Sequence, residues 1–135
     1  VGGPSDLERQ MGADIETAMT TPATNLIGQT NLKQLIALFE RGRVLVTPDS
    51  GPAHMANATD ITTISLHAAT DPRRSGAYRS RQFCVDYFAE AAARYRNATP
   101  DTLKWGTRIE DDAGVMSLIP VEAVTGRVDQ ALAAG

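Results

Sequence analysis

The chain has 135 residues and a formal net charge of −3, with 13 basic and 16 acidic side chains. This length suits one domain with a sizeable hydrophobic core. The slightly acidic balance gives no sign of nucleic-acid binding, and no apolar run approaches the length of a membrane span. A single cysteine, Cys84, excludes an internal disulfide framework and is typical of a reducing compartment. Cys84 stands in an apolar run at residues 83–85, which indicates a core residue rather than a nucleophile.

The first residues favour an amphipathic helix. Ser5 or Asp6 can cap this helix, which is expected to continue to about Thr20. Four apolar side chains recur every four residues and form its expected buried stripe: Leu7, Met11, Ile15 and Met19.

A short strand and a second helix are expected next. Residues 25–28 are apolar enough for a strand, and a possible helix cap follows at Thr30 or Asn31. Gly42 stands where a glycine often ends a helix. One apolar face of the helix is formed by Leu32, Leu35, Ile36 and Phe39.

Residues 44–58 predict a buried strand, a sharp polar turn and a short helix. Residues 44–46 are a continuous apolar run, as in a central parallel strand covered on both faces, and Pro48 ends it because proline lacks a ladder N–H. The turn consists of residues that cap a helix or let another molecule approach the backbone: Asp49, Ser50, Gly51 and Pro52. A turn of this kind presents free N–H groups and the positive end of a helix dipole, a geometry that binds phosphate or another anion.

His54 lies four residues after Ser50 and three after Gly51, so these positions share one face of a helix. His54 would then overlook the turn, and the carboxylate of Asp49 could accept hydrogen bonds from sugar hydroxyls. An ordinary capped turn, with His54 bonded to a neighbour, is the alternative, because such turns are common in α/β domains.

The second half of the chain predicts two further strands and two helices. The strands are expected at residues 61–66 and 82–86, and an alanine-rich helix at residues 87–96. Trp105 is the expected anchor of the polar segment at residues 97–114. A last helix opens at Pro120, and four apolar side chains are expected to dock it: Val121, Val124, Val128 and Leu132.

Two groups of charged side chains lie outside these elements. The first is a basic loop that could meet an anionic ligand, although a solvated surface is the more frequent outcome: Arg73, Arg74, Arg79 and Arg81. The second is the acidic run of Glu110, Asp111 and Asp112, which is interpreted as solvated because adjacent carboxylates do not converge on one point. The residues predict no metal site and no cofactor.

The alternation of helices and strands predicts an α/β fold with a doubly wound, mostly parallel, Rossmann-like sheet. Ligands of such sheets bind outside the carboxyl ends of the strands. Four segments leave those ends and are expected to converge on one cleft: residues 2–6, 28–31, 48–54 and 68–74. This convergence predicts a ligand site.

The run D-S-G-P-A-H-M-A-N-A at residues 49–58 resembles the D-[ST]-G-x-x-H-x-A-x-A signature of glycosyltransferase family 9, the ADP-heptose:lipopolysaccharide heptosyltransferases and their relatives. Residues 26–32, 70–72 and 119–124 resemble, in order, the family's G-x-[ST]-x-L, T-D-P and I-x-x-E-x-V segments. The resemblance covers nearly the whole chain except about residues 87–115. At residues 67–69 the chain has H-A-A where the family usually has Y-G-P.

The resemblance implies the GT-B architecture, in which two facing Rossmann-like domains transfer a sugar, with inversion and without a metal, from a nucleotide diphosphate donor. Asp49 would then hold the donor sugar, the turn at residues 50–52 the diphosphate, and His54 would support the turn. Gln29 and Thr30 would line the adenine and ribose side. The donor-binding residues that the resemblance implies are Asp49, Ser50, Gly51, Pro52, His54, Gln29, Thr30 and Asp71.

The opening Val1-Gly2-Gly3-Pro4 resembles the end of a strand in the C-terminal, donor-binding domain of that family. Residues 1–135 are therefore expected to be part of that domain, inactive alone. The N-terminal domain would bring the carboxylate base and the site for a glycolipid or glycan acceptor. The missing strand would leave a sheet edge open beside residues 26–27, where two chains could pair into a dimer. The resemblance also implies a cytoplasmic protein, peripheral to the inner membrane.

Two other functions stay open on the sequence. A nucleotide-sugar epimerase shares the two-domain architecture, but its D-S-G-G turn is followed by a glutamate, and Pro52 and His54 disfavour it. A non-catalytic domain that binds sugar nucleotides or serves as a scaffold would keep the fold without the chemistry.

Overall fold

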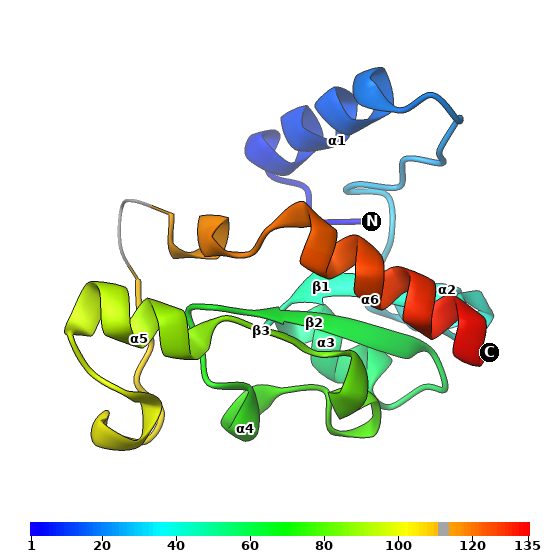
Figure 1. The fold of residues 1–135 in the computed structure, drawn as a ribbon. Coiled ribbons are helices and arrows are strands. Elements are labelled where there is room, and N and C mark those ends of the chain that lie inside the picture. Colours follow the sequence, from blue (N-terminus) through cyan, green and yellow to red (C-terminus); the bar gives the residue numbers. More distant parts are fainter. Residues whose placement is uncertain (111–113) are drawn as a thin grey trace. The chain divides into compact units, whose positions relative to one another are not determined.

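The computed structural model of the protein describes residues 1–110 and 114–135. The chain divides into two compact units, Val1–Leu38 and Phe39–Gly135 (Figure 1). Among the described residues, no helix combines the length and the hydropathy that crossing a membrane requires.

The first unit contains helix α1 (Asp6–Ala18), whose start is fixed by Ser5 and Glu8. The Ser5 hydroxyl accepts a hydrogen bond from the Glu8 N–H at 3.2 Å and donates to Glu8 Oε2 at 2.6 Å. The other oxygen of Glu8 accepts from the Gly3 N–H at 2.8 Å. These bonds satisfy N–H groups that a helix start leaves unpaired, so the predicted cap at Ser5 is confirmed.

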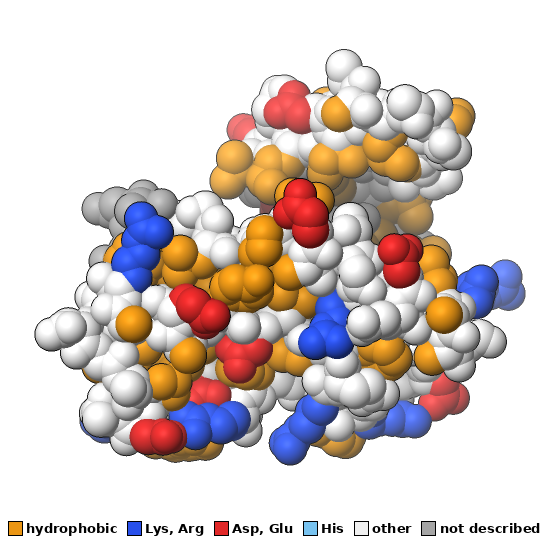
Figure 2. Space-filling view, viewed as in Figure 1, with side chains coloured by type: hydrophobic (Ala, Val, Ile, Leu, Met, Phe, Trp, Pro, Cys, Tyr) orange, Lys and Arg blue, Asp and Glu red, His pale blue; other side chains and the backbone are white. Residues whose placement is uncertain are grey.

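The apolar stripe of α1 is not buried, contrary to the sequence-based expectation. The one buried residue of the helix is Gly12, because the side chain of Ile27 lies where a Cβ of residue 12 would stand. The unit offers α1 no strand to pack on, and Figure 2 shows hydrophobic side chains along its surface. The exposed side chains are Leu7 at 72%, Met11 at 53%, Ile15 at 55% and Met19 at 44%.

The predicted strand at residues 25–28 is wrong, because residues 25–26 have no regular structure and residues 27–28 form a turn. Asn25 uses its side-chain oxygen to accept from the Ile27 N–H at 3.0 Å, and the Gln29 N–H donates to the Leu26 carbonyl at 3.1 Å. Gly28 has a φ of 69°, a left-handed conformation that glycine adopts easily. Local bonds thus take up the N–H groups of Ile27 and Gln29, whereas the N–H of Gly28 donates to the Gly2 carbonyl at 3.0 Å.

Helix α2 (Leu32–Arg41) spans the boundary between the two units. Asn31 caps it as expected, because the Gln34 N–H donates to Asn31 Oδ1 at 2.9 Å and the Asn31 N–H donates to Gln34 Oε1 at 3.0 Å. Of its predicted apolar face, Phe39 is buried, whereas Leu32 and Ile36 are exposed.

The second unit is built on a parallel three-stranded sheet with strand order β1-β2-β3. Strand β1 (Val44–Pro48) pairs with β2 (Thr62–His67), and β2 pairs with β3 (Val85–Asp86). Helix α6 (Val121–Ala134) covers one face of the sheet, and α3 (Gly51–Ala56) lies against the other (Figure 1). Helices on both faces of a parallel sheet confirm the predicted Rossmann-like α/β fold.

The prediction that residues 44–47 form a central strand is wrong. In the described sheet β1 pairs with β2 alone and is an edge strand, and Val46 is 42% exposed. The centre is β2, in which Thr63, Ile64 and Ser65 are almost completely buried. Pairing of two chains at an open edge stays a prediction.

Short segments connect these elements after β2. They are helix α4 (Pro72–Ser75), the 3₁₀ helix η1 (Tyr78–Phe83), helix α5 (Phe88–Arg96), and the 3₁₀ helices η2 (Pro100–Thr102) and η3 (Val115–Leu118). The helix predicted at residues 87–96 is confirmed as α5, whereas the strand predicted at residues 82–86 shortens to two residues because η1 extends to Phe83.

Among the described residues of the second unit, two hydrophobic clusters pack helices α5 and α6 against the rest of the unit. In the first, Phe88 and Ala92 of α5 pack with Ile109, whose N–H donates to the Ala69 carbonyl at 2.8 Å. Ile109 is fully buried and Trp105 is 65% exposed, so Ile109, not Trp105, anchors its segment. In the second cluster, α6 docks on Ile64 through Ala131 and Val128, whereas the expected Val121 and Leu132 remain exposed.

Replacing Ile64 by alanine tests the position of β2 at the centre of the sheet. Ile64 is fully buried, so Ile64→Ala should lower the free energy of unfolding by about 2–5 kcal/mol through lost contacts and a cavity. The control Val46→Ala, on the exposed edge, should cost less than about 1 kcal/mol. Urea unfolding followed by circular dichroism measures both, and equal losses would contradict this sheet order.

Candidate functional site

A tight turn joins β1 to α3, with Ser50 at the N-cap position and Pro52 in the first helical turn. The Ser50 hydroxyl does not cap the helix, since it donates to the Pro48 carbonyl at 3.3 Å and lies 3.3 Å from Thr47 Oγ1. The helix predicted after Pro48 is present as α3. The Ser50 hydroxyl, however, stabilises the turn before the helix instead of capping the helix.

The backbone at Gly51 is open to its surroundings. A Cβ added to Gly51 would meet nothing within 4 Å, and its φ lies outside the left-handed region. Neither packing nor backbone strain therefore requires a glycine at this position. Pro52 has no N–H, and the N–H of Ala53 donates to the Ser50 carbonyl at 3.0 Å, so an anion at this turn would meet the backbone mainly at Gly51.

Asp49 brings a carboxylate to this turn, and its side chain is only 11% exposed. Ser75 Oγ donates to Asp49 Oδ2 at 2.5 Å, and the imidazole Nε2 of His54 lies 3.5 Å from Oδ1. Burial alone would raise the pKa of Asp49, but hydrogen bonds from Ser75 and Thr70, together with His67 and His54, bring the pKa below its ordinary value. The carboxylate is therefore ionised at neutral pH.

Strand β2 ends at the buried His67, and the loop after it begins with the buried Ala68. His67 Nδ1 lies 3.1 Å from Thr70 Oγ1, and its Nε2 has no hydrogen-bond partner among the described residues. Burial lowers the pKa of His67, which keeps the ring neutral. Residues 67–69 differ from the family pattern, and the first two of them are therefore core residues close to the site.

Asp71, which the resemblance places in the donor site, caps helix α4. Its Oδ1 accepts from the Arg73 N–H at 2.8 Å, and its two oxygens also accept from the Arg73 guanidinium. The bonds from Arg73 hold the pKa of Asp71 below its usual range in spite of burial. Arg73 in turn reaches Asp101 through Nη1 at 2.7 Å. The oxygens of Asp71 are therefore occupied by the protein itself.

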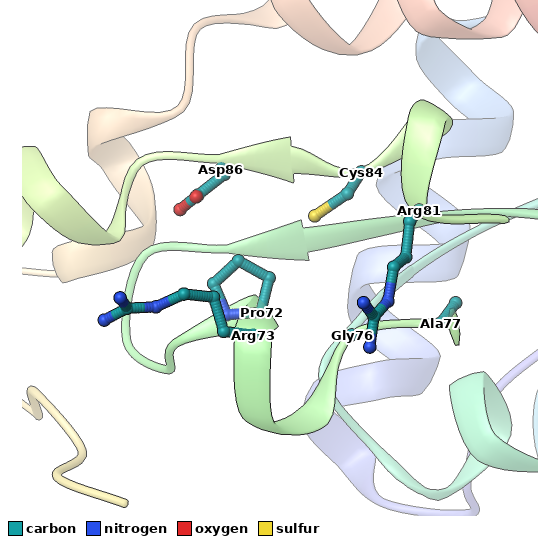
Figure 3. Close-up of a pocket in the computed structure, with 7 residues that line it drawn as sticks. All are labelled: Pro72, Arg73, Gly76, Ala77, Arg81, Cys84 and Asp86. Atoms are coloured by element: carbon teal, nitrogen blue, oxygen red, sulfur yellow. The ribbon is translucent and has the colours of Figure 1, made fainter. Parts of the chain in front are cut away.

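The other arginines of this region lie on the surface, as the sequence predicts. Arg79 pairs with Asp60 at 2.8 Å, while Arg74 and Arg81 have no ion pair with the described residues. Arg73, Arg81, Cys84 and Asp86 line a hollow of about 250 Å³ between α4 and β3 (Figure 3). Cys84 is half-buried and lines this hollow, so it is not the core residue that the sequence predicts. Burial nevertheless raises the pKa of its thiol, which disfavours the thiolate.

The predicted donor-binding residues fall in both units of the chain. The second unit brings together Asp49, Ser50, Gly51, Pro52 and His54 at one turn, with Asp71 at the start of α4. Gln29 and Thr30 belong to the first unit. Sequence reasoning missed Ser75 and the contact of Thr70 with Asp49. The T-D-P match could have indicated Thr70, whereas no local pattern connects Ser75 with a residue 26 positions earlier.

In the part of the chain that the structure describes, no group of histidine, cysteine, aspartate and glutamate side chains could hold a metal ion. Asp111 and Asp112 of the acidic run lie outside the described residues.

The chain is similar to curated heptosyltransferases. It is 32% identical over 125 residues to the lipopolysaccharide core heptosyltransferase OpsX of Haemophilus influenzae, covering 93% of this chain and 36% of the relative. It is 31% identical over 83 residues to lipopolysaccharide heptosyltransferase 1 of Pseudomonas aeruginosa, covering 60% of this chain and 22% of the relative. A match to lipopolysaccharide heptosyltransferase 3 of Escherichia coli reaches 40% over 52 residues, or 38% of this chain and 15% of the relative.

The chain therefore spans about a third or less of the length of these relatives. No solved structure matches it. The model of glycosyltransferase family 9 (heptosyltransferase) matches residues 1–104, which include the turn of Asp49 and the loop of Thr70. With this match over most of its length, and with a parallel α/β sheet that carries the family's signature turn, the chain belongs to glycosyltransferase family 9, the heptosyltransferase family.

Proposed function

We propose that the chain binds the nucleotide-diphosphate-sugar donor, of the ADP-heptose type, of an inverting glycosyltransferase in the synthesis of lipopolysaccharide or another cell-surface glycan. The observation that carries this proposal is the pair of Asp49 and Gly51 at one turn. An ionised carboxylate lies beside a glycine that neither packing nor strain requires. A hydroxyl-rich ligand with a diphosphate needs both features, namely an acceptor for hydroxyls and a backbone that it can approach closely.

Asp49 Oδ1 is the oxygen that accepts from the donor sugar. Oδ2 already accepts a short bond from Ser75, whereas Oδ1 lies 3.5 Å from Nε2 of His54, a side chain that is 58% exposed. The diphosphate lies at Gly51, and the His54 imidazole reinforces the turn and the phosphate. Gln29 and Thr30 line the adenine and ribose side, and Asp71 supports the site by capping α4.

The remaining parts of the reaction belong to the rest of the enzyme. The described residues include no carboxylate that matches the family's catalytic base, so this chain alone is expected to bind the donor without transferring the sugar. An N-terminal domain would supply the base and the glycolipid or glycan acceptor. We also propose that the protein acts in the cytoplasm, peripheral to the inner membrane, where the free thiol of Cys84 would remain reduced.

Loss of the Asp49 carboxylate is the first test. Asp49→Ala should weaken binding of ADP-heptose by about 2–4 kcal/mol, because no backbone N–H can replace an ionised acceptor for hydroxyls. His54→Ala should cost only about 1 kcal/mol, since it removes a supporting contact. Titration calorimetry on the 135-residue protein measures both, and Asp60→Ala, which removes an almost fully exposed aspartate, is the matched control.

If Asp49→Ala and His54→Ala both bind ADP-heptose as tightly as wild type, the turn has only a structural role. The non-catalytic scaffold would then be the remaining proposal for the function. A panel of other nucleotide sugars in the same titration defines the class of donor.

Gly51→Ala separates a ligand role from a folding role. A Cβ at this position meets nothing in the protein, so the unfolding midpoint should stay within the error of wild type or rise slightly, because alanine favours a helix. The same Cβ would keep a diphosphate from the backbone, and donor affinity should fall roughly tenfold or more, as for a lost hydrogen bond to a charged group. Unchanged affinity with unchanged stability would argue against diphosphate binding at this turn.

A further inference from the structure

We propose that Ser75 is a positioning residue, which fixes the Asp49 carboxylate in the orientation that presents Oδ1 to the hydroxyls of a ligand. This inference rests on the proposed donor-binding function and assigns a specific task to a residue outside the signature turn. Ser75 lies at the end of α4, 26 positions after Asp49 in the chain.

The contact between the two residues is a charge-assisted hydrogen bond. Ser75 Oγ donates to Asp49 Oδ2 at 2.5 Å, at the short end of the range for a hydroxyl and an ionised carboxylate. The Asp49 side chain is 11% exposed, so little water competes for this oxygen. A bond of this kind stops the carboxylate from turning about its last torsion, which would otherwise interchange its two oxygens.

Helix α4 holds Ser75 in place through several bonds within one turn. The Ser75 N–H donates to the Asp71 carbonyl at 3.3 Å, and the Gly76 N–H donates to the Pro72 carbonyl at 2.9 Å. A Cβ on Gly76 would stand 2.6 Å from the Pro72 carbonyl oxygen, so the chain leaves the helix in a conformation that excludes larger residues. Figure 3 shows Pro72, Arg73 and Gly76 in this compact turn.

The start of α4 is fixed as firmly as its end. Asp71 caps the helix and accepts from the guanidinium of Arg73, which also binds Asp101. Ser75 is therefore presented by a turn that is tied down on both sides. Small displacements of its hydroxyl are resisted, as positioning of a binding group requires.

Thr70, at the opposite end of the loop, is a second hydroxyl that acts on the same carboxylate. It is 3% exposed, its hydrogen bond contributes to the lowered pKa of Asp49, and its Oγ1 lies 3.1 Å from the buried His67 ring. The bond that orients Asp49 therefore comes from Ser75 in the loop after β2, and Thr70 of the same loop adds to the lowering of its pKa. Its own strand–helix turn contributes only the 3.5 Å contact of His54.

The test uses Ser75→Ala in the 135-residue protein, with Ser117→Ala as a matched control on an exposed serine of η3. The first readout is the pKa of the Asp49 carboxyl, followed by carbon NMR as a function of pH. Because the Ser75 bond stabilises the ionised form, its loss should raise this pKa. The second readout is calorimetric affinity for ADP-heptose, which should fall roughly tenfold, as for a lost charge-assisted bond.

Ser75→Thr keeps the hydroxyl and should restore both the pKa and the affinity. A merely structural role for Ser75 predicts a loss of stability with the pKa and affinity unchanged, and that result would overturn the inference. A raised pKa with wild-type affinity would overturn it as well. If Ser75→Ala does not fold, Ser75→Cys, whose thiol is a weaker donor, replaces it in both measurements.

Failure of the proposed function gives a different pattern. In that case wild type and Asp49→Ala would both fail to bind ADP-heptose, while the NMR titration of Asp49 would still report whether Ser75 fixes the carboxylate. The other outcome separates the two proposals. If wild type binds ADP-heptose, Asp49→Ala does not, and Ser75→Ala binds as tightly as wild type, the proposed function holds and only the role of Ser75 is refuted.

Discussion

The charge of Asp49 is the constraint on which the site depends. A largely buried carboxylate at the end of an edge strand loses hydration, and it stays ionised only if hydrogen bonds replace the lost water. Its own turn cannot supply them, because the Ser50 hydroxyl is bonded to the Pro48 carbonyl and Pro52 has no N–H. The donors come from Ser75 and Thr70 in a later segment of the chain. The loop after β2 and the turn after β1 are therefore held together at the charge of Asp49.

This dependence gives each residue of the T-D-P segment a separate physical task. Thr70 contributes a hydroxyl to Asp49, Asp71 caps α4, and Pro72 begins that helix with a backbone angle suited to its first position. The result of the three tasks is the placement of Ser75. The motif lies 21 to 23 residues from Asp49 in the chain and acts on the same carboxylate, so the two parts of the family resemblance are linked by a physical contact rather than only by their order.

The sequence correctly predicted the elements that are determined by neighbouring residues in the chain. The turn at residues 48–52 follows from Pro48, Gly51 and Pro52, and α5 follows from its alanine-rich run. Prediction failed where a competing partner decided the outcome, as at Asn25, whose side chain bonds the backbone of a would-be strand. Hydrophobic size was also a poor guide to anchoring, because Ile109 is buried whereas the larger Trp105 is exposed. Ser75 could not be predicted, since its role depends on a tertiary contact that no periodicity encodes.

The departure of this chain from the family pattern lies beneath the site. His67 and Ala68 replace the usual Y-G and are both fully buried, Ala68 in the cluster of Phe88 and Ile109. The backbone carbonyl of His67 accepts from the Tyr87 N–H at 2.7 Å and so joins the end of β2 to the start of α5. Its ring lies 3.1 Å from Thr70 Oγ1, and the Thr70 hydroxyl in turn helps to lower the pKa of Asp49. A neutral imidazole in the core can therefore influence the Asp49 carboxylate by orienting one neighbouring hydroxyl.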